Sequence, residues 1–146
     1  MKLNIKLSEG AVAPVRGSKL AAGYDLVALS KERVIKLVDG LPVEYIEYNT
    51  GVAIQLPETH VGLIFPRSSV RNTKLSLANC VGVIDADYIG EIKASFKETS
   101  LNGKMYGVGE RVCQLLVMPT EQLEFNIVDK LKKTERGSNG HGSTGK

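Results

Sequence analysis

The feature that most constrains the fold of this chain is a succession of short, β-branched runs, with no sustained helical period in any segment. Apolar and polar residues alternate within the first three runs, and Gly, Pro, Asn and Asp separate one run from the next. Eight runs are predicted as strands: residues 3–7, 33–38, 51–56, 61–65, 75–84, 92–96, 111–118 and 125–128. This spacing predicts an all-β sandwich, barrel or jelly roll, with room for one short helix that would begin at Pro66.

Length and charge set the class of molecule. A chain of 146 residues suits one domain that buries its own core. The formal net charge of +3 suits an anionic ligand without requiring one. A basic cluster near the C-terminus is interpreted as a solvent-exposed segment that leads into the tail; its members are Lys130, Lys132, Lys133 and Arg136. No nucleic-acid partner is expected, because such proteins usually gather basic residues on one face or helix.

The cysteines and the N-terminus indicate the compartment. Cys80 and Cys113 each lie inside an apolar run, so both are expected to be buried free thiols in a reducing compartment. They do not make a zinc site, since no histidine lies close to either in the sequence. The opening residues lack the apolar centre of a signal peptide, and no run is long enough to cross a membrane. We expect a cytoplasmic protein, or one of the host cytosol if the source is a virus, without a membrane partner.

The last eleven residues differ in character from the rest of the chain. Residues 136–146 contain four glycines and no apolar side chain, so they are expected to be disordered in the free protein. Residues 140–146 match the first seven positions of a P-loop, but a preceding strand, a hydroxyl after the lysine and a following helix are missing. Glycine N–H groups and hydroxyls can still wrap an anion. The sequence thus predicts a domain over residues 1–129 and a linker with a mobile arm over residues 130–146.

Two short segments offer groups that suit a phosphate. Gly23-Tyr24-Asp25-Leu26 places a carboxylate beside a turn, although aspartate after glycine is also a common turn residue. Pro66-Arg67-Ser68-Ser69 offers a guanidinium and two hydroxyls within three residues. That set suits a phosphate, but a capped short helix with a surface arginine has the same residues. Taken alone, each segment leaves both readings open.

Residues 82–92 and Gln114 extend this set of polar groups. Two apolar runs flank Asp85, Ala86, Asp87 and Tyr88, a pattern that predicts a hairpin. Strands that splay near the turn would expose backbone groups to a base edge, whereas a plain surface hairpin would have no such role. Gln114 lies among apolar residues, so its amide is either paired in the core or directed at a ligand.

In this order and spacing, the segments that begin near residues 23, 66, 82, 109 and 136 resemble the five motifs of the trimeric dUTPase family. The resemblance runs from AAGYDL at residue 21 to STGK at residue 146 and therefore covers most of the chain. It implies an all-β, jelly-roll-like (β-clip) subunit in a homotrimer with three active sites shared between subunits. It also implies hydrolysis of dUTP to dUMP and pyrophosphate, which keeps uracil out of DNA and supplies dUMP for dTMP synthesis.

The resemblance assigns roles to single residues. Asp85 matches the catalytic carboxylate that deprotonates the attacking water, and Tyr88 matches the aromatic ring under the deoxyribose. Uracil would be held by Asn79 and read by backbone groups of Gly82, Val83 and Ile84. Asp25 matches a carboxylate that reaches a Mg²⁺ cofactor through water or a phosphate. The remaining substrate-binding positions are matched by Arg67, Ser68, Ser69 and Gln114, and in the arm by Arg136, His141, Gly142, Ser143 and Thr144.

Three positions depart from the family pattern. His141 stands where the family usually has a phenylalanine that stacks on the uracil, Ile89 stands where many members carry a polar residue, and Ser69 replaces a frequent glycine. Two other functions remain as alternatives. A dCTP deaminase would share the fold, but no matching deaminase motif is present. A dUTP-sensing protein would bind a partner and turn over slowly. A nucleotide panel that measures pyrophosphate release separates these functions.

Overall fold

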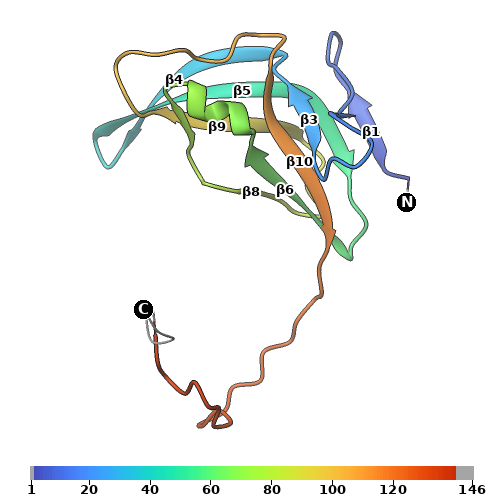
Figure 1. Cartoon of the computed structure of the whole chain (residues 1–146), viewed down its shortest axis with the longest axis vertical. Coiled ribbons are helices and arrows are strands. Elements are labelled where there is room, and N and C mark those ends of the chain that lie inside the picture. The colour runs from blue at the N-terminus through green and yellow to red at the C-terminus, as the bar shows by residue number, and fades with distance from the viewer. Residues whose placement is uncertain (1, 141–146) are drawn as a thin grey trace.

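Two antiparallel sheets form the folded part of the chain (Figure 1). The computed structural model describes residues 2–140. The first sheet has the order β1-β5-β9-β7, with β4 also paired to β5, and the second has the order β2-β3-β10-β6-β8. The elements are β1 (Asn4–Leu7), β2 (Val15–Arg16), β3 (Tyr24–Val27), β4 (Ser30–Val38), β5 (Leu41–Gln55), β6 (His60–Pro66), the short 3-10 helix η1 (Ser68–Asn72), β7 (Leu75–Leu77), β8 (Gly82–Ile84), β9 (Glu91–Glu98) and β10 (Arg111–Pro119).

The hydrophobic core lies between the two sheets. Along β9, Ile92, Ala94 and Phe96 are buried while the residues between them are not, which is the two-residue period of a strand with one buried face. A single buried cluster joins side chains of both sheets, among them Leu26, Ile46, Tyr48, Ile54, Ile64, Leu75, Phe96, Val112 and Leu115. The predicted all-β fold with one core is therefore confirmed.

The β4–β5 hairpin is much longer than the sequence indicated. Its two-residue turn is Asp39-Gly40, where both residues have positive φ and Val38 pairs with Leu41. Such turns match the right-handed twist of the flanking strands. β5 runs for 15 residues, of which only the last part was predicted. The hairpin projects beyond the second sheet on one side of the molecule (Figure 1).

Three predicted elements are wrong, and each error concerns which strands pair. Residues 75–84 are two strands, because the chain leaves the first sheet after β7 and enters the second sheet at β8. Residues 82–92 do not form a hairpin: β8 pairs with β6, whereas β9 pairs with β5 and β7. Residues 125–128 form no strand within this chain. The short strands β2 and β3 were missed.

The predicted helix is present, but it begins at Ser68. Pro66 is the last residue of β6, and Arg67 keeps an extended backbone with φ −84° and ψ 158° before η1 starts. The amide of Val70 donates to the carbonyl of Arg67 at 2.9 Å, which closes the first turn. The turn therefore fixes Arg67 at the exit of a central strand of the second sheet.

The two thiols differ in exposure, which corrects one prediction. Cys113 is fully buried on β10, and burial, with a smaller contribution from the charge of Asp25, raises the pKa of its thiol to about 12. Cys80 is exposed, because it lies in the turn between β7 and β8 with φ 60° instead of inside a strand.

This difference predicts how the thiols react. At pH 8, Ellman's reagent should label one thiol per folded chain quickly and the second only after denaturation, because thiolates are the reacting species. The Cys80→Ser variant should lose the fast labelling of the folded chain and keep the labelling that follows denaturation. Fast labelling of two thiols in the folded protein would contradict the burial of Cys113.

Beyond β10 the chain leaves the two sheets. Residues 120–140 contain no strand or helix and extend away from the folded part (Figure 1). Several apolar side chains in this segment are exposed to solvent in the single chain, among them Leu123, Phe125, Ile127 and Leu131. Within residues 2–140 no helix is long and apolar enough to span a membrane.

Candidate active site

Asp25 is held on β3 between two strands that also supply polar side chains. Asp25 pairs with Gln114 of β10, and Gln114 pairs with Phe65 of β6 on its other side. The ladder between β3 and β10 has a bulge between Arg111 and Cys113, so that Val112 and Cys113 are both buried. Side chains alternate along a strand, and an extra residue reverses the alternation. The bulge therefore turns Arg111 to the same face of the sheet as Gln114 and Asp25.

Both carboxylate oxygens of Asp25 are bound by arginines. Arg67 Nε donates to Oδ1 at 2.7 Å, and Arg111 Nη1 donates to Oδ2 at 3.0 Å. Only 12% of the Asp25 side chain is exposed, so little water competes for its oxygens. The carboxylate thus neutralises part of the positive charge and fixes both guanidinium groups, which keep further N–H donors for another anion.

The turn after β6 is fixed by Gln114 and carries two hydroxyls. Gln114 Nε2 donates to the carbonyl of Pro66 at 3.0 Å, so the amide predicted to be either paired or directed at a ligand is paired within the chain. A Cβ on Gly23 would lie 2.5 Å from Gln114 Oε1, so glycine leaves the amide its space. Arg67 Nη1 lies 3.3 Å from Ser69 Oγ, and Ser68 is exposed beside it. These residues form the cationic group, which we define as Asp25, Arg67, Ser68, Ser69, Arg111 and Gln114.

A second set of predicted residues lies along β8. β8 is an edge strand, since it pairs with β6 on one side and with no strand on the other within residues 2–140. Asn79 precedes it, and its Nδ2 lies 3.4 Å from the position that a Cβ on Gly82 would take. An edge strand offers backbone donors and acceptors to a ligand. The expected hairpin is absent, and the role of residues 82–84 toward a base edge stays a prediction.

Asp85 and Tyr88 follow β8 in the turn that crosses to the first sheet. The amide of Tyr88 donates to the carbonyl of Asp85 at 3.1 Å, and Tyr88 Oη donates to the carbonyl of Glu91 at 3.0 Å. The Tyr88 ring lies against Gly90, where a Cβ would come within 2.5 Å of its hydroxyl. Asp85 is exposed. We define Asn79, β8, Asp85 and Tyr88 as the base-reading group.

Within one chain the strand register separates Asp85 from the cationic group. Ile84 pairs with Gly62, so Asp85 is level with Val61 near the start of β6, whereas Pro66 and Arg67 are at its end. Five residue steps along an antiparallel strand span about 17 Å. Within one chain, the backbone at Asp85 and the backbone at Arg67 therefore lie near opposite ends of β6.

The surface next to Asp85 lacks the charge that a triphosphate needs. A groove with a volume of about 1020 Å³ is lined by Asp85, Asp87, Glu58 and Glu121, and no lysine or arginine of residues 2–140 contributes to it. His60, Val83 and Ile89 complete much of the remaining wall. Within the described residues, this groove therefore offers no cationic side chain to a substrate at Asp85.

The arm is described only in part. Arg136 is exposed, and its Nε donates to the carbonyl of Asn139 at 3.2 Å within the same segment. The predicted residues His141, Gly142, Ser143 and Thr144 lie outside the described residues.

Comparison with known proteins identifies the family. The model of the dUTPase family matches residues 9–145. The chain belongs to the dUTPase family. A deoxyuridine 5′-triphosphate nucleotidohydrolase of Escherichia phage T5 is 39% identical to this dUTPase-family chain over 145 residues, with 98% of each protein covered. Its counterpart in Corynebacterium diphtheriae is 42% identical over 134 residues, covering 90% of this chain and 84% of the relative.

Solved dUTPase structures share the fold. A mutant dUTPase of Staphylococcus bacteriophage 80alpha with dUpNHpp superposes with a TM-score of 0.80 at 27% identity, over 99% of this chain and 98% of that one. A mutant dUTPase from phage phi11 of S. aureus has a TM-score of 0.74 at 25% identity over 91% and 100%, and is described as coordinating a structural Mg(II) ion. The predicted family and its jelly-roll-like fold are thus confirmed.

Sequence reasoning missed Arg111 and Tyr106 near this dUTPase site. Arg111 shares the Asp25 carboxylate with Arg67, but only the bulge brings it to that face. Tyr106 lies in the connection before β10, and its hydroxyl is 2.9 Å from Ser69 Oγ. Tyr106 carries no motif signal, whereas Arg111 stands in the segment that begins near residue 109 but was not assigned a role there.

Proposed function

We propose that this chain hydrolyses dUTP to dUMP and pyrophosphate at active sites shared between subunits of a homotrimer. The observation that supports it best is the separation of a cationic, phosphate-binding group from a base-reading group at opposite ends of β6. Each group is incomplete as a site for dUTP, and the two complement each other in charge and chemistry. The names of the relatives and the bound dUpNHpp of the 80alpha enzyme agree with this substrate.

Each residue then has a defined task. Backbone groups of residues 82–84 and the amide of Asn79 bind the uracil, and Tyr88 packs under the deoxyribose. Arg67, Ser68, Ser69 and Gln114 of a neighbouring subunit hold the phosphates, and the N–H donors of Arg67 oppose the charge that develops on the leaving pyrophosphate. Asp85 accepts a proton from the water that attacks the α-phosphate. The arm closes the site with Arg136, Gly142, Ser143 and Thr144, while His141 covers the base.

Magnesium fits this site only as a partner of the substrate. No group of three or more metal-ligating side chains gathers within the described part of the chain, and both oxygens of Asp25 already accept from arginines. Asp25 can therefore approach Mg²⁺ only through water or a phosphate. The ion, when bound to the triphosphate, would screen its negative charge against the attacking water.

Two surface features support the assembly. In residues 123–127 apolar and polar residues alternate as in a strand, yet Phe125 and Ile127 are 91% and 96% exposed in the single chain. An apolar groove of about 270 Å³ is lined by Leu3, Ile5, Pro14, Tyr24, Ile54, Leu115 and Val117. Burying both features in a homotrimer would remove exposed apolar area from water.

The test is a nucleotide panel with the purified protein. Release of pyrophosphate from dUTP, with little from dTTP, dCTP or UTP, is the expected result, and we expect the enzyme to act in the cytosol. Ammonia release from dCTP would favour a deaminase instead. Tight dUTP binding with slow turnover and a stable protein partner would favour a signalling role, such as the control of virulence-gene transfer with which the 80alpha protein is described.

The arm gives a further prediction. Ending the chain after Glu135 should leave the oligomer intact, because the apolar residues 123–131 remain. It should lower kcat/KM for dUTP by at least about tenfold, since Arg136 and the hydroxyls of Ser143 and Thr144 are lost and hydrogen bonds to charged groups contribute most. Sedimentation and pyrophosphate release measure the two effects. Wild-type kcat/KM in the truncated protein would remove the arm from the site.

A further inference from the structure

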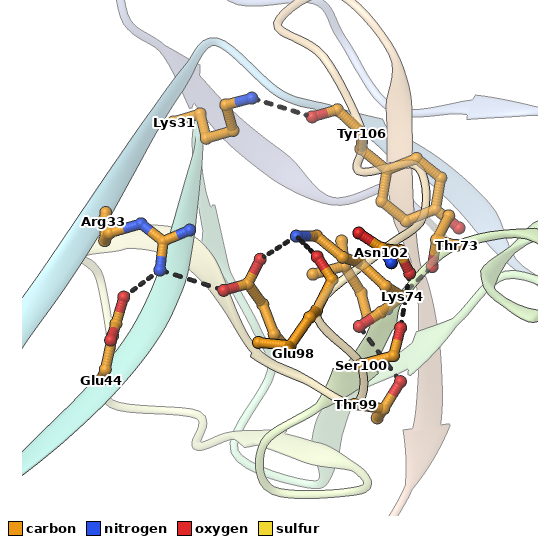
Figure 2. A network of polar contacts seen from close by, with 12 residues as sticks. Lys31, Arg33, Glu44, Thr73, Lys74, Glu98, Thr99, Ser100, Asn102 and Tyr106 are labelled. Carbon is orange, nitrogen blue, oxygen red and sulfur yellow. Dashed lines mark hydrogen bonds and ion pairs between the residues drawn. The ribbon is translucent and has the colours of Figure 1, made fainter.

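Tyr106 is a buried residue whose ring and backbone carbonyl are both held by neighbouring side chains. Its ring packs edge-on against Tyr48 and Phe96, with centroids 6.3 and 6.2 Å apart, and 6% of the residue is exposed. Its backbone carbonyl accepts from Tyr48 Oη at 3.0 Å and from Lys31 Nζ at 3.4 Å, the second of which is visible in Figure 2. The aromatic packing and these bonds hold the phenol in one orientation.

Lys74 anchors the segment that carries Tyr106 through hydrogen bonds and an ion pair. The Lys74 ammonium lies 2.6 Å from Glu98 Oε1 and donates to the carbonyl of Leu101 at 3.3 Å (Figure 2). The backbone amide of Lys74 donates to the carbonyl of Lys104 at 2.9 Å. Lys74 and Arg33 hold the pKa of the Glu98 carboxyl below its ordinary value, so this ion pair persists at neutral pH. These contacts therefore hold in place the backbone of the segment that precedes Tyr106.

The hydroxyl of Tyr106 has one hydrogen-bond partner within residues 2–140, which is Ser69 Oγ at 2.9 Å. Either hydroxyl could donate in this contact; because the buried Tyr106 proton has no other acceptor within residues 2–140, we assign Tyr106 as the donor and Ser69 as the acceptor. Ser69 Oγ also accepts from Arg67 Nη1 at 3.3 Å. A serine hydroxyl has two acceptor sites and one proton, and here both acceptor sites are filled. The proton of Ser69 is left for a third partner.

We propose that Tyr106 is a positioning residue for the phosphate chain of the nucleotide. Its hydroxyl fills an acceptor site of Ser69 and so turns the Ser69 proton outward, beside the free N–H groups of Arg67. Without the Tyr106 hydroxyl, Ser69 is free to rotate its proton inward and Arg67 Nη1 loses a fixed partner. The inference rests on the proposed function. Ser69 stands where the family pattern frequently has a glycine, and a glycine would give Tyr106 no hydroxyl to bind.

The test removes one oxygen atom. Tyr106→Phe should raise the Kd of the non-hydrolysable analogue dUpNHpp, measured by calorimetry, by about three- to tenfold, the range of one lost hydrogen bond. KM for dUTP should rise in parallel, while kcat changes by less than about twofold, because the chemistry at Asp85 is untouched. Ser69→Ala should have a similar effect on Kd.

The combined variant decides whether Tyr106 acts through Ser69. If it does, Tyr106→Phe adds nothing to Kd in the Ser69→Ala background, whereas independent effects would multiply. Thr50→Val is the matched control, because it removes another buried hydroxyl, which donates to the carbonyl of Ile92 at 2.8 Å, and should lower Tm without changing Kd.

Three results are distinguishable. A wild-type Kd in Tyr106→Phe, or multiplied effects in the double variant, would overturn the positioning role while the enzyme still hydrolyses dUTP. A Kd shift in Thr50→Val as large as that in Tyr106→Phe would also overturn it, since loss of stability would then explain both. Failure of the wild-type protein to release pyrophosphate from dUTP would instead overturn the proposed function.

Discussion

Replacing Asp85 with asparagine is expected to lower kcat for dUTP by roughly 10² or more, because positioned proton transfer typically contributes about 10²–10⁴-fold. Asparagine keeps the size and hydrogen-bonding ability of the side chain but cannot accept the proton of the attacking water. Asp85 is exposed at the end of an edge strand, so the fold should tolerate the change. Pyrophosphate release measures kcat, and the Kd of dUpNHpp should stay within about threefold, since hydrogen-bonding capacity is retained.

The control lies two residues away. Asp87 is exposed in the same turn and lines the same groove, so Asp87→Asn removes an equal charge from an equivalent surface. Its kcat should stay close to that of the wild type. Near-normal turnover in Asp85→Asn would remove Asp85 from the role of base. Equal losses of kcat in both variants would indicate an effect of the negative charge of the groove and not of proton transfer to Asp85.

The strands that the sequence predicted well have a local signal. β9 shows apolar and polar alternation, whereas β6 and β10 are short apolar runs; for all three, the predicted bounds lie within two residues of the observed ones. Alternation reports which face of a strand is buried. It does not report which strand lies beside it, and this is why residues 82–92 were predicted as a hairpin although β8 and β9 belong to different sheets.

In the candidate site, too, residues in short motifs were predicted from the sequence, whereas a residue placed by pairing between strands was not. Asp25, Arg67 and Gln114 stand in short motifs that are visible in the sequence, and the structure brings them together on adjacent strands. Arg111 joins them only because a one-residue bulge reverses its side, and a bulge is set by packing across the ladder. Roles carried by the arm rest on the resemblance alone.

The strand predicted at residues 125–128 fails for a related reason. Its alternation is typical of a strand with one buried face, but a single chain gives it neither a neighbouring strand nor a surface to cover. Apolar side chains that one chain leaves in water indicate a partner outside that chain. The separation of Asp85 from Arg67 along β6 leads to the same conclusion from the geometry of the site.

Sharing of sites between subunits can be tested by complementation. Asp85→Asn and Arg67→Gln should each be nearly inactive as homotrimers, the first for want of a base and the second because a phosphate-binding guanidinium is lost. The two variants, carrying different affinity tags, are co-expressed, and only trimers that contain both are purified. If Asp85 of one subunit works with Arg67 of the next, every mixed trimer has one intact site.

Mixed trimers should therefore recover about one third of wild-type kcat per trimer, whichever variant is in excess, because a closed ring with two kinds of subunit contains one favourable neighbour pair in three. A trimer of Asp85→Asn carrying both tags, purified in the same way, is the control and should stay inactive. Sites built within one chain cannot recover, since every chain of the mixture then lacks either its base or its guanidinium. Activity no higher than the mean of the two parent trimers would thus place Asp85 and Arg67 in one subunit's site and contradict the sharing inferred from their separation of roughly 17 Å along β6.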